Sequence, residues 1–139
     1  MKALITILFL VFLSGCAGQP TVGNLTKASA TQRAFNQQLA TEAAEQLHQL
    51  YAPATTTFVL GHLAKDEFGQ QLVKNLRDTG FAVAEFNTNA AGEPLAYVVD
   101  YAGEQTLLIT LRVGRTVTSR LYETQNNRLA ALGSWSRLE

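Results

Sequence analysis

Residues 95–122 read LAYVVDYAGEQTLLITLRVGRTVTSRLY, a stretch in which apolar and smaller or polar side chains alternate. The alternation runs in three segments that begin at Leu95, Leu107 and Val117. A period of two puts one set of side chains on one face of a sheet, which is typical of half-buried strands. Gly103 and Gly114 separate the segments, and such short turns favour antiparallel neighbours. The stretch therefore predicts consecutive strands of an antiparallel meander.

The chain beyond this stretch predicts one more strand. Asn126 and Asn127 follow it, and asparagine tolerates the left-handed backbone that a hairpin turn requires. Residues 129–138 then close the chain, with Trp135 as their largest side chain. The meander should thus contain about four antiparallel strands.

The chain before the stretch predicts two helices and two strands. Apolar residues recur every three or four positions in the first helix, so they share one face, and Pro53 ends it. Asp66 is a good N-cap for the second helix, and Gly80 stands just beyond its end. In order, we expect a helix over about 29–51, a strand over 55–63, a helix over 67–79 and a strand over 81–86.

Taken in order, these elements predict a small single α+β domain over residues 29–139. The fold is helix-strand-helix-strand followed by the meander. Because a sheet must bury its apolar face against something, both helices should pack on one face of the sheet. About 100 ordered residues can support such a core without disulfide bonds.

Residues 1–28 differ in composition from the rest of the chain. Lys2 precedes an apolar run that ends at Leu13, too short for a bilayer core, which needs about 20 residues. Such a run is typical of a secretory signal peptide. The next segment is similar to a bacterial lipobox, formed by Leu13, Ser14, Gly15 and Cys16.

The lipobox predicts how the N-terminus is processed. Residues 1–15 would be the lipoprotein signal peptide, and residues 16–28 the lipidated N-terminus and a flexible tether. The Cys16 thiol would carry a diacylglycerol and its amino group an acyl chain such as palmitate, which together anchor a protein stably to membrane lipid. Because Ala17 rather than Asp follows, the usual sorting rule favours the outer membrane with the domain facing the periplasm. A plain signal peptide with an incidental cysteine, a buried N-terminal helix and a surface-exposed domain remain alternatives.

Charge and cysteine content exclude several classes of function. The 139 residues hold 11 basic and 11 acidic side chains, and loss of Lys2 with the signal peptide makes the mature chain slightly acidic. Nonspecific binding of nucleic acid needs a basic surface, so no direct nucleic-acid partner is expected. A single cysteine excludes an internal disulfide and a multi-thiolate metal site.

Catalytic patterns are missing from the sequence. Neither His48 nor His62 has an acidic neighbour at a telling spacing. Ser134 lies in a Gly-Ser-Trp-Ser segment that lacks the second glycine of a nucleophile elbow. No glycine-rich phosphate loop is present. We therefore expect no enzyme activity, no small-molecule substrate, and no metal or cofactor besides the lipid on Cys16.

The one basic cluster consists of Arg112, Arg115 and Arg120. Because Arg112 and Arg120 flank the turn at Gly114, a hairpin should bring them near each other. The cluster is either a solvated sheet edge, where basic residues prevent strand-to-strand aggregation, or a patch for lipid headgroups or an acidic protein. Trp135 is either a core residue or a contact for a partner. These four residues are the candidate partner contacts.

Motifs along most of the mature chain resemble those of TrbH-type conjugal transfer proteins. The motifs are Leu-Ser-Gly-Cys at 13–16, Asp-x-Phe-Gly-x-x-Leu at 66–72, Pro-Leu-Ala-Tyr-Val-Val-Asp at 94–100 and Gly-Ser-Trp-Ser-Arg at 133–137. The resemblance implies a lipoprotein of the mating-pair-formation apparatus, a type IV secretion system. It would assemble or stabilise the transfer channel through protein partners in the core complex. The rival hypotheses are another envelope lipoprotein, such as a pilotin or a cell-envelope assembly or activator factor, and a lipid-anchored enzyme.

Overall fold

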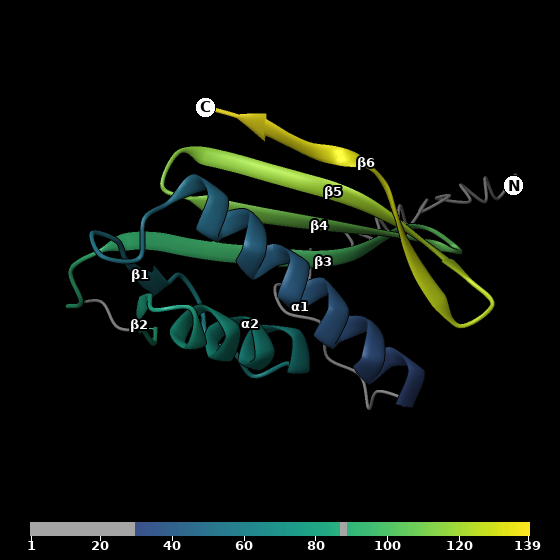
Figure 1. Ribbon diagram of the computed structural model, residues 1–139, viewed down its shortest axis with the longest axis horizontal. Helices are drawn as coiled ribbons and strands as arrows, with labels where there is room; N and C mark the ends of the chain where they lie inside the picture. The colour runs from purple at the N-terminus through teal and green to yellow at the C-terminus, as the bar shows by residue number, and fades with distance from the viewer. Residues whose placement is uncertain (1–29, 87–88) are drawn as a thin grey trace, which may run out of the picture.

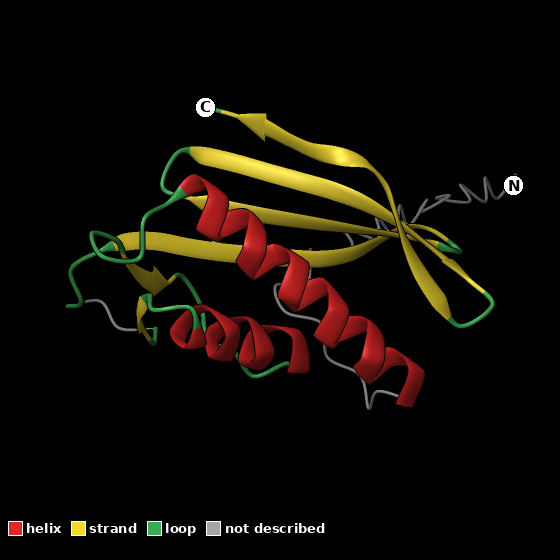
Figure 2. Ribbon diagram, viewed as in Figure 1, coloured by secondary structure: helices red, strands yellow, loops and turns green. Residues whose placement is uncertain are grey.

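The computed structural model describes residues 30–86 and 89–139, which form two helices and one sheet (Figures 1 and 2). The helices lie in one layer and the strands in a second layer behind them. In chain order, the elements are α1 (Ala30–Leu50), β1 (Thr57–Leu60), α2 (Glu67–Asp78), β2 (Ala82–Ala84), β3 (Glu93–Gly103), β4 (Thr106–Val113), β5 (Thr116–Gln125) and β6 (Arg128–Leu138).

The six strands form one mixed sheet in the order β2-β1-β3-β4-β5-β6. Strands β3 to β6 are the predicted antiparallel meander, and β1 pairs in parallel with both β2 and β3. The predicted α+β class and the helix-strand-helix-strand order are confirmed. The strands β1 and β2 are shorter than predicted, because only 57–60 and 82–84 pair with a neighbour.

Both ends of α2 follow from local sequence chemistry. The Asp66 carboxylate accepts a 2.9 Å hydrogen bond from the backbone N–H of Gly69, which caps the first turn as predicted. At the other end, Gly80 has a φ of +95° and donates to the Arg77 carbonyl, while Phe81 donates to the Leu76 carbonyl. This pair of bonds is a Schellman motif, and it confirms Gly80 as the residue just past the helix.

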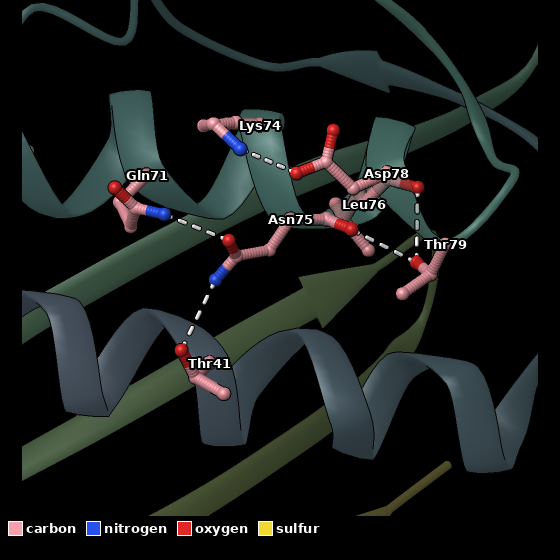
Figure 3. Close-up of polar contacts among 7 residues, drawn as sticks. All are labelled: Thr41, Gln71, Lys74, Asn75, Leu76, Asp78 and Thr79. Atoms are coloured by element: carbon pink, nitrogen blue, oxygen red, sulfur yellow. Dashed lines mark hydrogen bonds and ion pairs between the residues drawn. The ribbon is translucent and has the colours of Figure 1, made fainter.

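Polar side chains join α1 to α2 (Figure 3). The Asn75 amide donates to the Thr41 hydroxyl at 3.3 Å and accepts from the Gln71 amide at 2.8 Å. Thr79 closes the end of α2 by donating its hydroxyl to the carbonyls of Asn75 and Leu76. The Asn75–Thr41 bond links the two helices, while the other bonds lie within α2 and its C-terminal end.

The core lies between the helices and one face of the sheet. Leu39, Ala43 and Leu47 of α1 are fully buried, as the predicted helical spacing requires. The alternating positions of the meander supply the other side. Its buried residues are Leu95, Tyr97, Val99, Leu107, Ile109, Leu111, Val113, Thr118, Tyr122 and Leu129.

The opposite face of the sheet has no described helix on it. We call this surface the open face. Its residues alternate with the buried ones along β3 to β6. They are Ala96, Val98, Asp100, Thr106, Leu108, Thr110, Arg112, Val117, Ser119, Leu121, Glu123, Gln125, Arg128, Ala130, Leu132, Ser136 and Leu138.

The edge strand β6 bends in its middle (Figure 1). Its register with β5 jumps from Ser119↔Ser136 to Leu121↔Leu132, so extra residues bulge out of β6 opposite Arg120. Gly133 lies in this bulge with a φ of +75°, a conformation that favours glycine. The bulge breaks the regular edge that an unprotected outer strand would otherwise present.

Candidate functional site

The predicted lipidation site lies outside the described residues. This holds for Leu13, Ser14, Gly15 and Cys16, and for the whole predicted signal peptide and tether. In the described residues 30–86 and 89–139, neither α1 nor α2 has the length and hydrophobicity of a membrane-spanning helix.

The three arginines of the candidate partner contact do not form one cluster. In the β4–β5 hairpin, Arg112 is paired with Val117, whereas Arg120 is paired with Ile109. Because paired residues share a face, Arg112 lies on the open face and Arg120 on the helix-covered face. Arg115 is exposed in the turn between the two strands. The expectation that the hairpin brings Arg112 near Arg120 is therefore wrong.

Arg120 joins a polar cluster between β5 and α1. Its Nη1 lies 3.3 Å from Oε2 of Glu42, and its Nε donates a 2.9 Å hydrogen bond to the carbonyl of Gly133 in the β6 bulge. The Tyr122 hydroxyl donates to the same Glu42 oxygen at 2.8 Å. The Arg120 guanidinium also lies 5.6 Å from the centre of the Tyr122 ring, within cation–π range.

The electrostatics of this cluster favour a structural role. Burial and the hydrogen bond to the Glu42 carboxylate raise the pKa of the Tyr122 phenol above its ordinary value, so it stays a neutral donor. Arg120 and Glu42 each keep 24% of their side-chain surface exposed, so solvent weakens their attraction. The cluster fixes β5 and the β6 bulge against α1.

Trp135 lies next to this cluster and is partly buried against the core. It lines a shallow polar pocket on the surface, together with Glu42, Glu45, Gln46, Gln49, Arg120 and Ala131. Of the four candidate contacts, Arg120 and Trp135 both line this pocket. Arg112 lies on the open face and Arg115 in the β4–β5 turn.

Sequence reasoning did not single out Glu42 or pair Tyr122 with it. Ala43 belongs to the buried stripe of α1. Glu42 directly precedes it and therefore lies at the border of the helix–sheet interface. An acidic side chain at that border weakly indicates that a hydrogen-bond donor on the sheet faces its carboxylate. Only the register of β5 shows that this donor is Tyr122 rather than Leu121 or Glu123.

A second polar cluster links α2 to β3. The Tyr97 hydroxyl donates a 2.5 Å hydrogen bond to Oδ2 of Asp66, the same carboxylate that caps α2. The His62 ring lies 4.4 Å from the Tyr97 ring, and its Nε2 accepts a 3.4 Å contact from the Tyr97 backbone N–H. Burial and the Asp66 carboxylate raise the pKa of Tyr97 above its ordinary value. The ring contact and the hydrogen bonds of this cluster therefore stabilise the fold.

The remaining chemistry-bearing groups are dispersed. His48 is exposed and packs edge-on against Phe81, with 5.8 Å between the ring centres, whereas His62 contacts Tyr97. In the described part of the chain, no three histidine, cysteine, aspartate or glutamate side chains come together as a metal site would require.

The fold and surface define the chain as a small two-layer α+β domain with polar clusters that hold its layers together and one open sheet face. The comparison with protein families then identifies it more closely. Residues 19–139 match the family model described as conjugal transfer protein TrbH, and the chain belongs to that family of conjugal transfer proteins. No curated protein and no solved structure matches the chain.

Proposed function

We propose that this protein is a lipid-anchored, non-enzymatic subunit that helps assemble or stabilise the channel of a conjugative type IV secretion system. The observation that carries the proposal is membership in the conjugal transfer family over residues 19–139, which includes every described element. The family links the chain to transfer, and the lipobox at 13–16 supplies the link to a membrane.

The proposed anchor limits where the domain can work. A fully extended chain spans at most about 3.5 Å per residue, so the chain between Cys16 and the start of α1 at Ala30 can reach roughly 50 Å. A domain tethered at the inner leaflet of the outer membrane would therefore contact channel proteins close to that membrane. Slow escape from the membrane would also raise the local concentration of the domain around its partners.

The non-enzymatic part of the proposal is supported by what the polar clusters do. Asp66 and Glu42 both accept hydrogen bonds from buried tyrosines, and Arg120 is bound to Glu42 and the β6 bulge. A general base needs a lone pair directed at a substrate, and these carboxylates direct theirs into the protein. Their role is to hold the layers of the domain in register.

Replacing Cys16 by Ser tests the lipid anchor. The variant should lose incorporation of a labelled fatty acid, move from the membrane to the soluble fraction, and transfer the plasmid at least tenfold less often. Ser14→Ala is the matched control, because it keeps a small residue in the lipobox and leaves the acylated cysteine in place.

Two outcomes would contradict the proposal. A Cys16→Ser protein that stays in the membrane fraction and supports normal transfer would exclude the lipid anchor. If Cys16→Ser disturbs the envelope in cells that carry no transfer genes, the protein is instead a general envelope assembly factor or pilotin.

A further inference from the structure

An apolar band crosses the open face. Leu108, Leu121 and Leu132 are successive Cα partners on β4, β5 and β6, so they form one row across three strands. Leu121 is 39% exposed and Leu132 is 45% exposed. A row of leucines that no described residue covers is typical of a surface that binds another protein.

Charged side chains lie at opposite ends of this band. Asp100 extends the leucine row onto β3, and Glu123 lies one row further toward the β3–β4 turn. In the other direction, Arg112 lies two rows away on the same face, and Arg115 is in the turn beyond it. At about 3.4 Å per residue, the Asp100 and Arg112 rows are roughly 14 Å apart. Arg128, which pairs with Gln125 at the start of β6, is a basic side chain on the same face beyond Glu123.

The two acidic and two basic side chains at the ends of the band form no ion pair within the described domain. In the described part of the chain, no ion pair involves Asp100, Glu123, Arg112 or Arg115. Asp100 accepts a hydrogen bond only from its neighbour, the backbone N–H of Tyr101, at 2.8 Å. The open face therefore has a mainly acidic end, which also carries Arg128, and a basic end, where the Glu93 carboxylate lies next to the turn at Gly114.

We propose that two copies of this chain bind each other through the open face, related by a two-fold axis that passes over Thr110 at right angles to the strands. This axis keeps the strand order but reverses the strand direction, so the Leu108 row of one copy lies over the Arg112 row of the other. The contact is isologous, and each interaction therefore occurs twice. Two sheets packed in this way lie about 10 Å apart, a gap that facing side chains fill.

The charges match in this arrangement. Asp100 of one copy lies over Ala96 of the second copy, and the neighbouring strand, about 4.8 Å to the side, carries Arg112. Glu123 lies over the β4–β5 turn of the second copy, which contains Arg115. The leucine row is covered by the row of Ala96, Arg112, Val117 and Leu138, so Leu121 lies over Val117, Leu132 over Leu138, and Leu108 over the aliphatic stem of Arg112. The parallel arrangement of two copies would instead place like charges together, which is unfavourable.

Sedimentation equilibrium of the detergent-solubilised full chain tests the dimer. We expect a dimer at about 100 µM, and a Kd at least tenfold weaker for Leu121→Arg, because a buried guanidinium would replace the centre of the band. Leu63→Arg is the matched control: Leu63 is 53% exposed but lies in the loop after β1, off the open face. A monomeric wild type, or equal effects of the two variants, would overturn the proposal and leave a channel protein or the preceding residues of the chain as the occupant.

Charge exchange tests the two-fold arrangement itself. Arg112→Asp and Asp100→Arg should each weaken the dimer roughly tenfold, since each brings like charges together across the interface. The double variant restores opposite charges and should return to within about threefold of wild type. A double variant whose dimer is as weak as that of either single variant, or weaker by the sum of both effects, would overturn the arrangement. Because these measurements do not depend on the acyl chains, their outcome is separate from that of Cys16→Ser.

Discussion

The Tyr97 phenol and the Asp66 carboxylate join β3 to the first turn of α2 through a 2.5 Å hydrogen bond. Asp66 is only 5% exposed, and the second oxygen of its carboxylate accepts a hydrogen bond from the N–H of Gly69. One side chain therefore serves a helix end and a buried hydroxyl together. Losing it affects two elements that are far apart in the sequence.

Asp66→Ala should lower the free energy of unfolding by about 2–4 kcal/mol. The loss of the cap contributes about 1 kcal/mol, and the buried Tyr97 hydroxyl left without a partner contributes about 1–3 kcal/mol. Tyr97→Phe keeps the cap but leaves the buried Oδ2 of Asp66 without its donor, so it should cost about 1–3 kcal/mol, less than Asp66→Ala by the value of the cap. Urea unfolding followed by circular dichroism measures both. Equal losses in the two variants would show that the cap contributes nothing.

Gly69→Ala should destabilise the protein, although alanine normally stabilises a helix by about 1 kcal/mol over glycine. A Cβ at Gly69 would lie 1.8 Å from the Tyr97 hydroxyl oxygen and 2.6 Å from the ring carbon that bears it. The ring must move, and we expect a loss of about 1–3 kcal/mol.

Two further variants test this explanation. In Gly61→Ala the nearest atoms are 3.5 Å from the new Cβ, an ordinary contact, so the stability should stay within about 0.5 kcal/mol of wild type. Combining Gly69→Ala with Tyr97→Ala should cost less than the sum of the single changes, because the clash is gone. Strict additivity would rule out the steric cause.

The sequence predictions were correct where a feature depends on residues close together in the chain, and they failed where it depends on residues far apart or on a turn. The Asp66 cap and the glycine after α2 were correct because a cap contacts its own helix within three residues. The placement of Arg112 beside Arg120 was wrong because it depends on the turn. Val113 pairs with Thr116, so the turn has two residues, and positions eight apart then fall on opposite faces. The Glu42–Tyr122 contact spans 80 residues, and no local pattern determines it.

Alkaline pH should destabilise the domain through two buried tyrosines. The folded pKa of Tyr97 and of Tyr122 is raised above the ordinary value of 10.0, because burial and a neighbouring carboxylate disfavour the phenolate. Above pH 10 the unfolded chain loses these protons while the folded chain keeps them. The stabilisation is thus complete below pH 10, and each tyrosine removes up to about 1.4 kcal/mol per pH unit above it.

Urea unfolding at pH 8, 10 and 11 measures this slope. The Tyr97→Phe and Tyr122→Phe variants should each show a shallower loss of stability between pH 10 and 11, and the double variant the shallowest. Tyr101→Phe is the matched control, since the Tyr101 side chain is 52% exposed, and it should keep the wild-type slope. An unchanged slope in the double variant would assign the alkaline loss to other groups.

The β5–β6 turn should tolerate only residues that accept a left-handed backbone. Asn126 and Asn127 have φ values of 50° and 58°, the pair of positive angles that a two-residue hairpin turn of this type requires. Asn127→Val should cost about 1–2 kcal/mol of unfolding free energy, because a branched Cβ clashes in this region, whereas Asn127→Gly should stay within about 0.5 kcal/mol of wild type. Glu104→Val in the β3–β4 turn, where the backbone φ is not positive, should cost less than Asn127→Val in the same thermal or urea unfolding series. Equal losses at the two turns would mean that side-chain solvation, rather than the backbone angle, selects asparagine at this hairpin.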